Sequence, residues 1–81
     1  MATQHRFEVG QTYRIENIHW TLFFRVTRRT AKSIFFEDDY GTWRHRASVQ
    51  VLQAATSDYS TEFVEFNEHG YGLSMSANNV A

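Results

Sequence analysis

The feature that most restricts how this chain can fold is the alternation of apolar and polar side chains in two neighbouring segments, 18–27 and 32–38. Side chains of a β-strand point alternately to two faces, so a period of two predicts strands with one buried face. The apolar positions are Ile18, Trp20, Leu22, Phe24 and Val26 in the first segment, and Ile34 and Phe36 in the second.

The connection Arg28–Ala31 is polar and short enough for a β-hairpin between these segments. If the paired residue numbers sum to about 60, Val26 lies opposite Ile34 and Phe24 opposite Phe36 on the buried face. The same register places Arg25 opposite Phe35 on the other face. A slip of one residue would mix the two faces, so the parity of the pairing is strongly specified.

Weaker alternation predicts further strands over residues 11–16, 42–51, 62–66 and 71–75, with turns at 38–41 and 67–70. Short strands joined by short turns favour a mostly β fold, a small antiparallel meander or barrel of five to six strands. A short helix over residues 45–55 or at the C-terminus is the alternative, because Ala47, Val51 and Ala55 share helical spacing.

The 81 residues predict one domain, with residues 1–7 as a loose arm and a β core over about 8–75. Cysteine is absent, so neither disulfides nor cysteine-based zinc sites can support so small a core. We expect aromatic side chains to stabilise the small core instead, since each buries a large area. The chain has seven Phe, four Tyr and two Trp.

Charge is distributed unevenly along the chain. All eight basic residues lie at or before Arg46, and the acidic positions near the end of the chain are Asp58, Glu62, Glu65 and Glu68. The net charge of −1 argues against bulk adhesion to nucleic acid or anionic lipid. No apolar run has the length of a membrane span, and the first residues lack a signal-peptide core, so we expect a cytoplasmic protein.

The sequence contains no pattern typical of a catalytic or metal centre. The four histidines have no metal-ligand spacing, no nucleophile motif is present, and the acidic run Glu37–Asp39 falls at a strand end and turn. His45 is expected on the apolar face as a half-buried, hydrogen-bonded side chain. We therefore expect a non-enzymatic domain with no catalytic residue, metal or cofactor.

One basic and aromatic group of residues could form a binding face. Sheets that bind single-stranded nucleic acid combine aromatic rings for base stacking with Arg and Lys for phosphates. In the alternative interpretation, the two phenylalanines form a second core layer, and the arginines cover apolar surface with their stems. The candidate residues are Phe23, Arg25, Phe35, Arg44 and Arg46 on the face opposite the main core, with Arg28, Arg29 and Lys32 at the adjoining hairpin end.

The stretch Phe24–Phe36, with its Arg-Arg-Thr-Ala-Lys connection, resembles small uncharacterised proteins of bacterial mobile elements and phages. In those proteins a Gly-containing turn and an Arg follow, here Gly41 and Arg44 or Arg46. The C-terminal segment Gly70–Ala77 is similar to their closing Tyr-Ser-Met-Ala pattern, although the Pro that often follows there is missing. The resemblance implies a small β-rich accessory protein and brings no activity, cofactor or partner.

These observations predict a domain that acts by binding. Protein–protein interaction or self-association is the first hypothesis, because a small aromatic-rich domain often leaves apolar surface or a sheet edge available. Nucleic-acid binding through the Arg25–Arg46 face is the alternative.

Overall fold

The computed structural model describes residues 4–41, 43–53, 60–68 and 70–81, and these residues form strands and turns without a helix. The mostly β class predicted from the alternation is confirmed. The strands are β1 (Gln4–His5), β2 (Thr12–Glu16), β3 (Thr21–Arg29), β4 (Ser33–Asp38), β5 (Arg44–Ser48), β6 (Gln50–Gln53), β7 (Ser60–Glu68) and β8 (Tyr71–Ser76).

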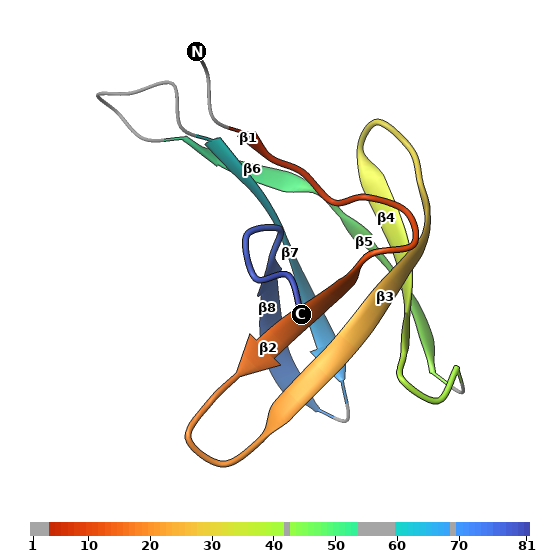
Figure 1. Cartoon of the computed structure of the whole chain (residues 1–81), viewed down its shortest axis with the longest axis vertical. Coiled ribbons are helices and arrows are strands. Elements are labelled where there is room, and N and C mark those ends of the chain that lie inside the picture. Colours follow the sequence, from red (N-terminus) through yellow and green to blue (C-terminus); the bar gives the residue numbers. More distant parts are fainter. Residues whose placement is uncertain (1–3, 42, 54–59, 69) are drawn as a thin grey trace.

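The strands form two four-stranded sheets and not the single meander of five to six strands that we predicted (Figure 1). One sheet has the order β2-β3-β4-β5, and in the other β7 pairs with β6, β8 and, in parallel, with β1. The chain passes from one sheet to the other at Val49, between β5 and β6, where the Val49 amide donates to the Lys32 carbonyl at 2.7 Å. The segment predicted as one strand over 42–51 is therefore bent into two strands.

The helix alternatives are also wrong for the described residues. Residues 44–48 and 50–53 are strands, and residues 54 and 55 lie outside the described part, as does most of the loop predicted over 56–60. The C-terminal residues lie against β2, where Arg14 N donates to Asn79 O at 2.8 Å and Ala81 N donates to Thr12 O at 3.0 Å. This pairing joins the two sheets on the side away from the β5–β6 bend.

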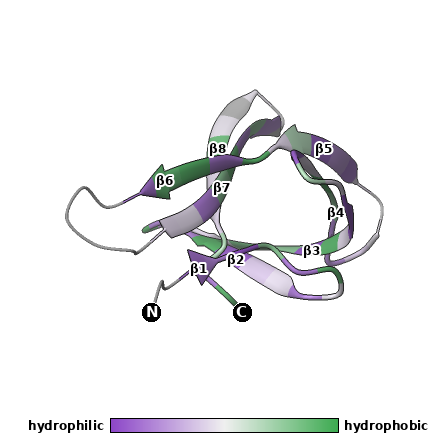
Figure 2. Ribbon diagram, turned by 90° about the horizontal axis from the view of Figure 1, so that it is seen from above, coloured by the Kyte–Doolittle hydropathy of each residue, from purple (hydrophilic) through white to green (hydrophobic). Residues whose placement is uncertain are grey.

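Both sheets enclose one core (Figure 2). The inward face predicted for β3 and β4 is confirmed at Phe24, Val26, Ile34 and Phe36, and the alternation along β2 and β7 likewise buries one face of each strand. The buried apolar residues are Phe7, Tyr13, Ile15, Phe24, Val26, Ile34, Phe36, Ala47, Val64, Phe66, Met75 and Ala77. The core thus extends past the predicted limit at residue 75. His45 is half-buried beside it and stacks on Trp43 with ring centroids 5.0 Å apart.

The first part of the predicted strand 18–27 is a turn. The Asn17 side-chain oxygen accepts hydrogen bonds from the amides of His19 and Trp20 at 2.7 and 3.0 Å. Asn favours such local side-chain to backbone bonds, which compete with strand pairing. Ile18 is consequently 93% exposed, and β3 begins only at Thr21.

The register between β3 and β4 differs from the prediction by two residues. Val26 lies opposite Phe36 and Phe24 opposite Asp38, so the predicted faces are retained although the partners are not. A β-bulge then places the extra residue Thr27 between Val26 and Arg28. Beyond the bulge the parity reverses, because one additional residue rotates all that follow to the opposite face.

The predicted loose arm is wrong for residues 4–7, whereas residues 1–3 lie outside the described part. Gln4 and His5 pair with the start of β7, and Phe7 is 1% exposed. The Phe7 ring packs edge-to-face against Tyr13 with centroids 4.9 Å apart. The Tyr13 hydroxyl accepts a hydrogen bond from the Glu8 amide at 2.8 Å, and burial raises the pKa of Tyr13. Strand pairing at Gln4 and His5 and burial of the Phe7 ring together hold this segment against the core.

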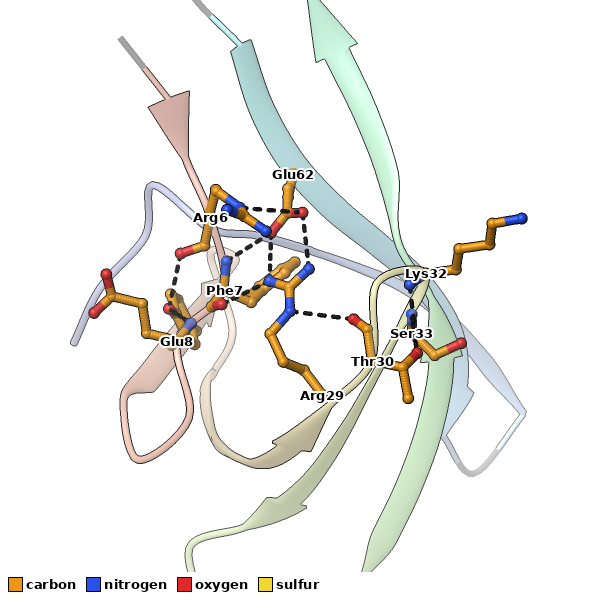
Figure 3. Close-up of polar contacts among 9 residues, drawn as sticks. Arg6, Phe7, Glu8, Arg29, Thr30, Lys32, Ser33 and Glu62 are labelled. Atoms are coloured by element: carbon orange, nitrogen blue, oxygen red, sulfur yellow. Dashed lines mark hydrogen bonds and ion pairs between the residues drawn. The ribbon is translucent and has the colours of Figure 1, made fainter.

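Arg29, Glu62 and the Phe7 backbone form a polar group that we call the latch (Figure 3). Glu62 accepts hydrogen bonds from Phe7 N at 2.8 Å and from the Arg29 guanidinium at 2.9 and 3.1 Å. Arg29 also donates to Phe7 O at 2.7 Å. Burial alone would raise the pKa of Glu62, but these hydrogen bonds and the charges of Arg29 and Arg6 outweigh it and lower that pKa.

We expect Glu62→Gln to lower the free energy of unfolding at neutral pH by about 2–3 kcal/mol, because Arg29 loses a buried charged partner. The contribution of a carboxylate whose pKa is lowered on folding is present above its unfolded value, 4.5, and is lost as pH falls through the folded value. The difference in unfolding free energy between variant and native protein should therefore become smaller at acidic pH. Urea unfolding across pH measures it, with Glu65→Gln, an exposed change on the same strand, as the control. Equal stability of the two variants at pH 7 would contradict this role of the latch.

Candidate functional site

The outer face of the sheet β2–β5 carries most of the predicted binding residues. Cross-strand neighbours in a sheet share a face, so the pairings define rows of side chains on this surface. One row consists of Arg28 on β3, Phe35 on β4 and Arg46 on β5, and the next consists of Arg25, Glu37 and Arg44. We call these the Phe35 row and the Glu37 row.

The Phe35 row combines an aromatic ring with a cation on either side. The Arg28 guanidinium carbon lies 5.1 Å from the centroid of the Phe35 ring, within the range of a cation–π contact. Beside the ring is an open hollow of about 260 Å³. It is lined by Thr27, Phe35, Phe36, Arg44, His45 and Arg46. The described residues place no carboxylate in this row or among the residues lining the hollow.

The Glu37 row is partly neutralised. Glu37 forms an ion pair with Arg25, and its second carboxylate oxygen lies 3.9 Å from Arg44 Nε. The side chain of Glu37 is 13% exposed, so this carboxylate lies beneath two more exposed arginines. From the sequence, Glu37 was expected only as part of an acidic strand end and turn. Only the correct register, which places Arg25 opposite Glu37 and not Phe35, could have identified its role.

Phe23 lies at the other end of the face and in a different electrostatic environment. Its cross-strand neighbour is Arg14 on β2, which forms an ion pair with Glu16 at 3.0 Å. A separate hollow of about 290 Å³ beside Phe23 is lined by Thr21, Leu22, Phe23, Phe24, Asp38, Asp39 and Tyr40. Phe23 is therefore bordered by carboxylates, whereas Phe35 is bordered by arginines.

Two of the eight predicted residues do not lie within the rows of this face. The bulge at Thr27 turns Arg29 to the inner side of the sheet, opposite Ile34, where it belongs to the latch. Lys32 is exposed in the turn that adjoins the Phe35 row, and Figure 3 shows it extending away from the latch. The outer face contains, as predicted, Phe23, Arg25, Phe35, Arg44 and Arg46, and the bulge adds Arg28, which was expected at the hairpin end.

The exposure of Phe23 and Phe35 is intermediate. Both rings are half-buried and neither belongs to the core, which consists of side chains on the inner side of the sheets. The alternative interpretation of a second core layer therefore does not describe them. Of the two rings, only Phe35 has an arginine as its neighbour on both adjacent strands, so it is the ring at which a ligand could pack and meet cations at the same time.

Comparisons with protein-family models, with curated proteins and with solved structures found no match for this chain. The resemblance to proteins of mobile elements and phages therefore stays a prediction. Within the described ranges there is no group of three or more His, Asp or Glu side chains placed to hold a metal ion. The same residues include no helix long and apolar enough to cross a membrane.

We expect Phe35→Ala to lower the free energy of unfolding by about 1 kcal/mol, because it removes a half-buried ring and one cation–π contact. Phe36→Ala, at the neighbouring core position, should cost about 3–5 kcal/mol. Urea unfolding of both variants measures the contrast. A loss for Phe35→Ala as large as that for Phe36→Ala would assign Phe35 to the core and remove it from the candidate site.

Proposed function

We propose that the chain is a non-enzymatic binding domain whose outer face, on the sheet β2–β5, binds nucleic acid. The observation that carries this proposal is the Phe35 row, in which one aromatic ring lies between two arginines on adjacent strands. Arginines supply phosphate contacts, and a half-exposed ring supplies a surface on which a base can stack. Both components are present on one face within the spacing of neighbouring strands.

The charge of this face supports an anionic ligand, although the whole chain has a net charge of −1. In addition to Asp38 and Asp39 in the hollow beside Phe23, five arginines and two glutamates of the four strands lie on this face, so its excess of positive charge is concentrated around the Phe35 row. The residues are Arg14, Arg25, Arg28, Arg44 and Arg46, with Glu16 and Glu37. Local potentials direct binding within about a Debye length, so this excess matters more than the overall charge.

The double variant Arg28→Gln/Arg46→Gln should weaken binding of a fluorescent oligonucleotide by about 10- to 100-fold in ~50 mM salt. It should also reduce the slope of log K against log salt by about two, one unit for each lost phosphate contact. Fluorescence anisotropy across a salt series measures both quantities. Arg6→Gln removes a charge outside the outer face and is the control. Absence of binding by the native protein in low salt would reject this proposal.

Self-association is the second candidate function, and the β6 edge favours it. In the described part of the chain β6 pairs with β7 alone, so its other edge has unpaired backbone groups. Val51 and Leu52 on this edge are 59% and 66% exposed, and residues 47–53 include no charge. Edge strands are usually protected by charged side chains or proline, and this one is not.

The occupant that fits this edge is a second copy of the chain. Antiparallel β6–β6 pairing about a twofold axis at Leu52 would place the two Leu52 side chains against each other and extend the sheet across the dimer. An uncharged edge allows this approach without like-charge repulsion. Four residues per copy make a small contact, so the dimer should be weak and dependent on concentration.

Leu52→Lys should abolish dimerisation, because it places like charges at the axis of the paired edges. Sedimentation equilibrium from micromolar to millimolar protein measures the effect. Ser74→Lys adds the same charge to an exposed position of β8 and should leave the dimer intact. A native protein that stays monomeric over this range would exclude self-association.

A further inference from the structure

The outer face has two half-buried aromatic rings, and the structure gives them unequal surroundings. We infer that the ligand of this face is a single-stranded nucleic acid, with one unstacked base placed against Phe35 in the hollow beside that ring. The inference rests on the proposed nucleic-acid binding and specifies the strand state of the ligand and the position of the base.

The rings of Phe35 and Phe23 differ in the charged residues that line the hollows beside them. The hollow beside Phe35 has Arg44 and Arg46 in its lining and no carboxylate among the described residues. The hollow beside Phe23 is lined by Asp38 and Asp39, which would repel a phosphate next to any base stacked there. A nucleotide carries its phosphate with its base, so only the Phe35 hollow suits both groups.

The geometry of the Phe35 hollow matches one nucleotide. The hollow adjoins the Phe35 ring and is lined by Thr27 of β3 and by residues of β4 and β5, while Arg28, which lies over the ring, is not part of its lining. Its volume of about 260 Å³ leaves room for one planar base with solvent around it. Arg46 lies directly across from Phe35, at the roughly 5 Å spacing of cross-strand neighbours, and Arg44 is two residues further along β5. Phosphates on either side of a base stacked on Phe35 can therefore meet an arginine.

The curvature of the sheet favours a single strand over a duplex. The sheet β2–β5 bends around the core, so its outer face is convex (Figure 2). Duplex DNA is stiff over about 150 base pairs and would contact a convex face along one line, reaching few of its arginines together. The bases of a duplex are also stacked on each other, and taking one out costs a few kcal/mol. A flexible single strand follows the curve and offers its bases without that cost.

The test compares binding of a ten-nucleotide thymidine strand, of a ten-base-pair duplex and of an abasic strand of the same length. Anisotropy in low salt should give the tightest binding for the thymidine strand. Phe35→Leu should weaken that binding about 5- to 100-fold with an unchanged salt slope, because stacking is lost while the phosphate contacts remain. Phe23→Leu, the matched control, should leave it within about twofold.

The abasic strand provides a measurement that does not depend on how a variant folds. It retains the phosphates, so native protein should bind it about as weakly as Phe35→Leu binds the thymidine strand. Duplex binding as tight as single-strand binding, or equal effects of Phe35→Leu and Phe23→Leu, would overturn this inference and leave the proposed function standing. Failure to bind any of the three ligands would instead reject the proposed function itself.

Discussion

The latch between Arg29 and Glu62 is the interaction on which the arrangement of both sheets depends. Arg29 is at the end of β3 and Glu62 is in β7, so their two hydrogen bonds join one sheet to the other. Both side chains also bind the Phe7 backbone, which fixes the segment before β2 between them. A largely buried ion pair is tolerated here because nearly every donor and acceptor has a partner, and removal of either residue would leave the other charge uncompensated.

The β-bulge at Thr27 makes the latch and the outer face compatible. Without the extra residue, the alternation along β3 would turn Arg28 inward and Arg29 outward. With it, Arg29 reaches Glu62 while Arg28 lies over Phe35 on the opposite side of the sheet. Two adjacent arginines thus have different roles, one in stability and one in the proposed binding. The single residue inserted before them determines which of the two faces inward.

The sequence predicted most of the residues of the candidate site but not the residues with which they pair. Alternation alone placed Phe23, Arg25 and Phe35 on the outer side, because parity is insensitive to a register shift of two. Because of the same shift, the pairing of Arg25 with Glu37 was not predicted. Because of the bulge, the inward position of Arg29 was not predicted either. Asp38 and Asp39 distinguish the surroundings of Phe23 from those of Phe35, and they come close to Phe23 because the β3–β4 register places Asp38 opposite Phe24.

The sequence by itself determined the β class, the inward faces of β2, β3, β4 and β7 and the concentration of arginines before residue 47. These properties follow from local periodicity and composition, which any strand pairing must satisfy. Only the tertiary structure decided the division into two sheets, the docking of Phe7 and the burial of Glu62, because each depends on contacts between residues far apart in the chain. Glu62 and Arg29 are 33 residues apart. A charged side chain is stable in the interior only when it is paired, and no local sequence pattern predicts a partner at that distance.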